Sequence, residues 1–106
     1  MNRQQQIDSF LAQAHRLALE RLRAQPHRVM EVQAQLARWR GLSGPTRSDV
    51  YLDEWERLLK LPVEKLEAAV CADTDHATVL RSVSPVSVLI TQAERAHLLA
   101  QARLAA

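Results

Sequence analysis

The segment Ile7–Leu22, IDSFLAQAHRLALERL, decides the fold class of this 106-residue chain. Its apolar side chains recur every three or four positions, which is the spacing of one face of an α-helix. They are Ile7, Phe10, Leu11, Ala14, Leu17, Ala18 and Leu22. The spacing predicts a helix over about residues 4–24, and the chain around it is expected to pack against this apolar face.

Proline and glycine mark where the first helix stops and a second one runs. Pro26 disfavours helical geometry at Gln25 but suits the first turn of a helix, so a second helix is expected after it. Gly41 supplies a stop for that helix. The segment 41–46, GLSGPT, contains both glycines of the chain and is therefore expected to be a loop.

Four shorter helices are expected after this loop. One covers about residues 48–60, and Pro62 fits the first turn of the next. The acidic segment 73–75 can cap another helix. Thr91 and Glu94 match a capping box, in which each side chain accepts a hydrogen bond from the backbone amide of the other, so the last helix is expected to begin near residue 92.

The run Val86–Ile90 is apolar and follows the helix-ending pair Ser84–Pro85. Its β-branched residues predict an extended connector between two helices. Two interpretations stay open. Either the connector crosses the core, or its exposed edge faces another chain, which includes pairing with its own symmetry mate in a homodimer.

These elements predict an all-α protein with a single compact domain of five or six helices over residues 1–106. An N-terminal helical hairpin, residues 1–40, is expected to pack on a C-terminal unit of four shorter helices, residues 46–104. Two glycines and 4% aromatic residues are too few for a multi-stranded sheet.

Charge is distributed unevenly along the chain. Residues 1–47 carry eight arginines and three acidic residues, net +5, whereas residues 48–106 carry six basic and nine acidic residues, net −3. A basic half can face nucleic acid or an acidic protein surface. Cys71 is the single cysteine, and neither a signal peptide nor a membrane span is apparent, so a cytoplasmic protein without membrane contact is expected.

No catalytic, metal or cofactor motif emerges from the sequence. The four histidines lack the spacing of a metal site; they are His15, His27, His76 and His97. Cys71 has no adjacent base, and two glycines do not make a phosphate-binding loop. The chain is therefore expected not to be an enzyme and to bind neither metal nor cofactor.

One segment nevertheless resembles an enzyme motif. Arg21-Leu-Arg-Ala-Gln-Pro-His27 is similar to the arginine–histidine spacing of helical nucleases that cleave RNA through the ribose 2′-hydroxyl. This resemblance implies an RNase-like toxin in which Arg21 and His27 act together. Leu22 stands where those nucleases usually carry a polar residue, and Pro26 interrupts the helix on which the pair should lie.

Two groups of residues have the composition of a binding surface. The first combines arginine with aromatic side chains, as binding hot spots do, and consists of Arg38, Trp39, Arg40, Arg47 and Tyr51. Its arginines also suit phosphate groups, so nucleic-acid binding for autoregulation is an alternative. The second group surrounds the apolar connector and consists of Arg81, Ser84, Pro85, Val86, Val88 and Arg95.

The order of four motifs resembles a group of small, helical bacterial proteins found in toxin–antitoxin-like pairs. The motifs lie between about residues 29 and 97 and read Leu36-Ala-Arg-Trp39, Tyr51-Leu-Asp-Glu-Trp55-Glu-Arg-Leu-Leu, Leu80-Arg81-x-x-Ser84-Pro85 and Leu89-x-x-x-x-Glu94-Arg95. Val86 and Ser87 depart from the aromatic residue and the glycine of similar sequences. The resemblance implies an antitoxin, a non-catalytic protein-interaction module whose partner is a toxin.

Overall fold

The computed structural model describes residues 2–104, and its first helix, α1, spans Arg3–Ala24. A capping box starts this helix: the Asn2 side chain accepts a hydrogen bond from the Gln5 amide at 2.8 Å, and the Gln5 side chain accepts one from the Asn2 amide at 3.0 Å. The helix ends before Pro26, which opens a short 3₁₀ helix. The other elements are η1 Pro26–Arg28, α2 Val29–Ser43, α3 Asp49–Leu58, α4 Val63–Val70, α5 Asp75–Ser82, η2 Pro85–Leu89 and α6 Gln92–Leu104.

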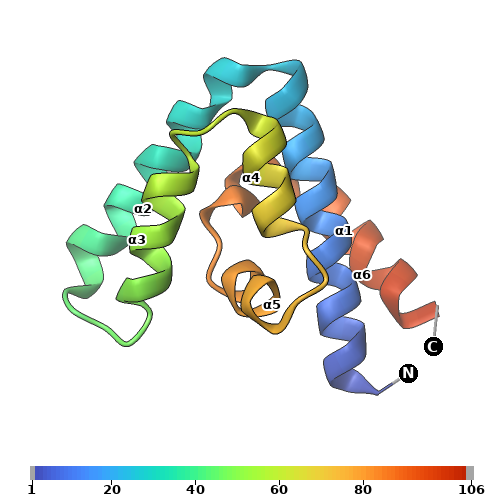
Figure 1. Ribbon diagram of the computed structural model, residues 1–106. Helices are drawn as coiled ribbons and strands as arrows, with labels where there is room; N and C mark the ends of the chain where they lie inside the picture. The colour runs from blue at the N-terminus through green and yellow to red at the C-terminus, as the bar shows by residue number, and fades with distance from the viewer. Residues whose placement is uncertain (1, 105–106) are drawn as a thin grey trace.

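The helices α1 and α2 diverge from η1 like the two sides of an inverted V (Figure 1). The helix α3 runs back along α2, and α6 packs along α1. The remaining elements fill the angle between the two long helices, where η2 packs against both of them. The described residues thus form one all-helical domain without a β-strand.

Trp55 is at the centre of the core. Its side chain is fully buried, and its indole Nε1 donates a hydrogen bond to the Leu80 carbonyl at 3.0 Å, which joins α3 to α5. Buried aliphatic side chains from α1, α2, α4 and η2 surround it. They include Leu19, Leu22, Val32, Leu36, Leu66, Val70, Val86 and Leu89.

An ion pair fixes the start of α6 against α1. Arg21 binds the Glu94 carboxylate through both terminal nitrogens, and its Nη1 also donates to the Leu89 carbonyl at 2.8 Å. Glu94 simultaneously closes the expected capping box with Thr91, with backbone-to-side-chain distances of 2.9 and 3.2 Å. The capping-box prediction is therefore confirmed, and Arg21 adds a long-range contact to it.

The predicted end of the second helix at Gly41 is wrong, because the helix extends beyond this residue. The helix continues through Gly41 to Ser43, because an exposed glycine costs an α-helix only about 1 kcal/mol. Gly44 ends it instead, with φ 63°, a left-handed conformation that favours glycine.

No helix within residues 2–104 has the length and hydropathy needed to cross a membrane.

The extended conformation predicted for Val86–Ile90 is also wrong. Residues Pro85–Leu89 form the 3₁₀ helix η2, started by Ser84, whose side chain accepts a hydrogen bond from the Val86 amide at 3.2 Å. Only Ile90 is extended. Val86 and Leu89 are buried, as the core-crossing interpretation requires, whereas the Val88 side chain is 41% exposed.

Candidate functional site

The turn between α2 and α3 presents apolar side chains to solvent. We call residues 38–51 the α2–α3 tip. Leu42, in the last turn of α2, is 81% exposed, and Val50, in the first turn of α3, is 65% exposed. Both therefore lie at the same end of the pair of helices, which Figure 1 shows extending away from the rest of the fold.

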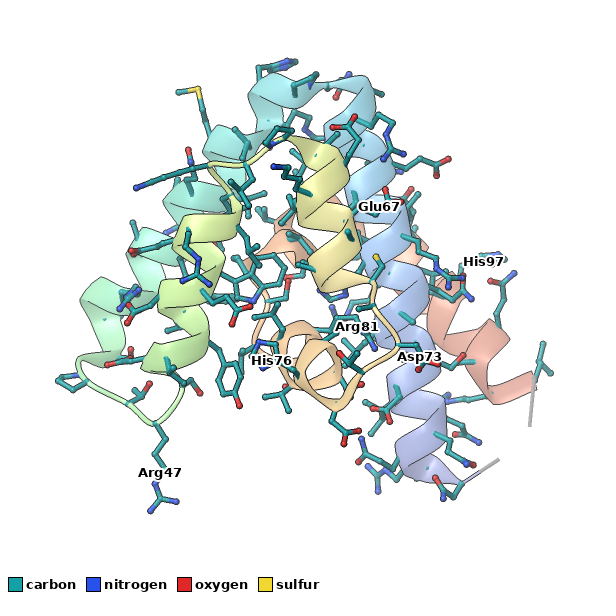
Figure 2. The ribbon with its side chains drawn as sticks, viewed as in Figure 1. Arg47, Glu67, Asp73, His76, Arg81 and His97 are labelled. Atoms are coloured by element: carbon teal, nitrogen blue, oxygen red, sulfur yellow. The ribbon has the colours of Figure 1, made fainter. Side chains whose placement is uncertain are left out.

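The three arginines of the tip have different roles. Arg40 contacts two carboxylates of α3: it binds Asp53, and its Nη1 lies 3.1 Å from Glu56 Oε1. Arg38 is exposed and donates to the neutral Gln35 side chain at 3.1 Å. Arg47 is exposed and points away from the fold (Figure 2). Within residues 2–104, neither Arg38 nor Arg47 forms an ion pair.

The aromatic residues of the tip are half-buried rather than fully in the core. The Trp39 side chain is partly exposed to solvent. Tyr51 packs at the edge of the main core, and its ring centroid lies 5.8 Å from that of His76 in α5. His76 is in turn 2.8 Å from the Glu54 carboxylate. The tip therefore contains arginine and aromatic side chains together with exposed aliphatic ones.

Arg81 of the second predicted group has a structural role. Only 8% of it is exposed, and its Nη1 donates to the carbonyls of Val70 at 2.7 Å and Ala72 at 3.0 Å. These carbonyls lie at and beyond the end of α4, so Arg81 places a positive charge where the helix dipole favours one. It lies inside the fold beside α5 in Figure 2.

The rest of the second group is divided between core and surface. Pro85 and Val86 are buried, Ser84 caps η2, and Val88 and Arg95 are exposed. The structure therefore does not unite the two predicted groups. One lies at the α2–α3 tip, and the other lies where α5, η2 and α6 meet α1.

Part of the second group lines a cavity of about 150 Å³ between these elements. We call it the His15 cavity. Arg81, Ser84, Val86 and Arg95 contribute to its walls, as do Phe10 and His15 of α1. Phe10 and His15 were not predicted as site residues from the sequence. For His15, the available signal was a histidine at the edge of the apolar face of a helix.

His15 is the buried titratable group of this region, with 4% of its surface exposed. Burial lowers its pKa to about 4; the hydrogen bond to the Leu11 carbonyl opposes this shift, and the charge of Arg81 adds to it. Nδ1 lies 2.7 Å from that carbonyl oxygen, which only accepts, so Nδ1 carries the proton. Nε2 is then a neutral acceptor, and it is buried without a hydrogen-bond partner among the described residues.

The residues of the other sequence hypotheses lie apart from both sites. Arg21 is bound to Glu94, whereas His27 lies exposed in η1. Burial raises the pKa of the Cys71 thiol, which disfavours the reactive thiolate. Among residues 2–104, no group of histidine, cysteine and acidic side chains is arranged to hold a metal ion.

Comparison with known proteins found no matching family model, curated protein or solved structure.

Proposed function

We propose that this chain is a non-catalytic, cytoplasmic protein-interaction module that binds an acidic protein surface through the α2–α3 tip. The observation that carries the proposal is the exposure of Leu42 and Val50, 81% and 65%. They lie at the end of the molecule where, among residues 2–104, Arg38 and Arg47 have no ion-pair partner. Exposed apolar side chains surrounded by polar ones are typical of protein interfaces.

Charge supports an acidic partner. Arg40 uses its charge within the fold, on Asp53 and Glu56, but Arg38 and Arg47 remain available to carboxylates of another protein. Asp49 is the acidic group closest to Arg47 in sequence, and its carboxylate accepts a hydrogen bond from Thr46 at the start of α3. A partner would bury the aliphatic side chains and pair the two arginines, the arrangement of an apolar interface centre with a charged rim.

The shape of the tip favours binding without a large rearrangement. The contacts of Arg40 with α3 join the two helices near their turn, and Gly44 provides the conformation on which the turn depends. A surface already held in one conformation loses less entropy on binding than a flexible loop. The resemblance of the sequence to toxin–antitoxin-like pairs makes a toxin the partner class within this proposal.

The test is purification of the tagged protein from its native host, followed by identification of the bound material and measurement of its affinity. We expect a stoichiometric acidic protein that survives nuclease treatment. The double variant Leu42→Ser with Val50→Ser should weaken binding at least about tenfold, and Arg47→Glu should do likewise.

The matched control is Leu104→Ser, because Leu104 is 83% exposed but lies in the last described turn of α6. This variant should bind as the wild type does. Arg40→Glu is unsuitable because it would place a carboxylate against Asp53 and Glu56. Complete loss of the retained material on nuclease treatment, with a steep dependence on salt, would instead identify the protein as a nucleic-acid binder.

A further inference from the structure

Both apolar and polar residues line the His15 cavity. Phe10 and Leu11 of α1, with Val86 and Ile90, contribute apolar side chains. Ser84 and Ser87 contribute hydroxyl groups. A volume of about 150 Å³ matches the cavity size at which one benzene-sized ring is accommodated in a protein interior.

The charge around the cavity is positive. Arg81 and Arg95 line it, and no aspartate or glutamate among residues 2–104 does. The Arg81 guanidinium donates hydrogen bonds to carbonyl and hydroxyl oxygens, and within residues 2–104 it forms no ion pair. A buried cation without a counterion attracts an anion from solution.

Arg95 lines the cavity beside Phe10. Its guanidinium carbon lies 5.2 Å from the centroid of the Phe10 ring, in the geometry of a cation–π contact. The neighbouring carboxylate, Glu94, is already bound to Arg21. Within residues 2–104, Arg95 has no ion-pair partner, so its charge is available to a ligand.

His15 also lines the cavity, and its ring carries a buried polar atom. Its Nε2 is buried and has no partner among the described residues. Arginine and serine side chains also line the cavity, so it differs from a simple packing defect, whose walls would be apolar throughout.

We propose that the His15 cavity binds a compact monocarboxylate with an apolar body about the size of benzoate. The carboxylate pairs with Arg95 near the hydroxyl groups of Ser84 and Ser87, and the body contacts Phe10 and Ile90. This site is separate from the α2–α3 tip, so the proposal does not depend on the protein-binding function.

Benzoate is the probe, titrated into the full chain while backbone amide shifts are followed by NMR. We expect saturable shifts centred on Ser87, Ile90 and Arg95. Arg95→Gln should weaken benzoate binding at least about tenfold, because it removes a charge-assisted contact. Arg103→Gln, at another exposed arginine of α6, should leave the affinity unchanged. Ser87→Leu, at an exposed position, should block the cavity.

The comparison ligands are benzyl alcohol and acetate, which lack the charge and the apolar body respectively. Each should bind at least about tenfold more weakly than benzoate. No saturable shifts up to about 20 mM benzoate, or equal affinity of wild type and Arg95→Gln, would overturn the proposal. Acetate binding as tightly as benzoate would also overturn it, since that result would indicate a non-specific anion contact. The tip variant Leu42→Ser with Val50→Ser should bind benzoate normally.

Discussion

Mild acid is expected to destabilise the fold through His15. In the folded chain the imidazole is buried and neutral, and its pKa is lowered from 6.5 to about 4. In the unfolded chain the same group takes up a proton near pH 6.5. Between these values the unfolded state binds one more proton than the folded state, so the free energy of unfolding falls as the pH falls.

The magnitude follows from the size of the shift. A difference of one pKa unit corresponds to about 1.4 kcal/mol, so the full effect of His15 is about 3 kcal/mol, reached near pH 4. Between pH 7 and pH 5 the loss is about 2 kcal/mol. Domains of this size have a total stability of about 5–15 kcal/mol, so the loss is readily measured.

The assay is urea unfolding at pH 7 and pH 5, followed by tryptophan fluorescence and circular dichroism. Glu94 contributes mainly below this range. Its pKa is lowered from 4.5 to about 2, by the hydrogen bond from Arg21 first and by Thr91 second, so its contribution is lost as the pH falls from about 4.5 toward 2. Glu94 therefore contributes little between pH 7 and pH 5, where His15 has its main effect.

The decisive comparison is with His15→Gln, which cannot titrate. At pH 7 the free energy of unfolding of this variant is expected to differ from that of the wild type. The fall of about 2 kcal/mol that His15 causes between pH 7 and pH 5 should be absent from the variant. The exposed His97 provides the control, and His97→Gln should keep the slope of the wild type. An unchanged slope in His15→Gln would refute the reasoning.

Three further predictions concern the fold. Gly44→Ala should lower the free energy of unfolding by about 2 kcal/mol, because φ is 63° at this residue. Gly41→Ala should raise it by about 0.5–1 kcal/mol, because Gly41 has helical geometry and open space around it. Urea unfolding measures both effects. Trp55→Phe should cost about 3 kcal/mol, since it removes the indole and leaves the Leu80 carbonyl unpaired, which thermal unfolding will detect. Arg81→Met should cost about 2–4 kcal/mol by leaving the carbonyls at the end of α4 unpaired, and amide exchange should accelerate in that helix. Equal effects of the two glycine substitutions, or unchanged stability in either of the other variants, would contradict these assignments.

The helices could be predicted from the sequence because their signals are local. Apolar periodicity located α1, and the side chains of Thr91 and Glu94 placed the start of α6. The end of α2 was harder to predict, because glycine tolerates both a helix and a turn, and neighbouring residues did not distinguish Gly41 from Gly44. The run Val86–Ile90 is too short for periodicity to separate a strand from a 3₁₀ helix.

The candidate sites depended on contacts between distant residues. The role of Arg81 depends on the open end of α4, which its own sequence neighbourhood does not show. The His15 cavity likewise brings α1 to residues about 70 positions later in the chain. Local composition pointed to arginine and aromatic side chains near the tip. It did not show that Arg40 would pair within the fold, whereas Arg47 forms no ion pair in the part of the chain that the structure describes.

The most direct test of the central claim is hydrogen–deuterium exchange of the purified chain, alone and in complex with the protein partner identified from the host. If the α2–α3 tip is the binding surface, the complex should show slower exchange in peptides covering residues 38–51, and the peptides of α6 should exchange as they do in the free chain. Protection confined to η2 and α6, with residues 38–51 unchanged, would contradict the account and move the interface to the opposite part of the molecule.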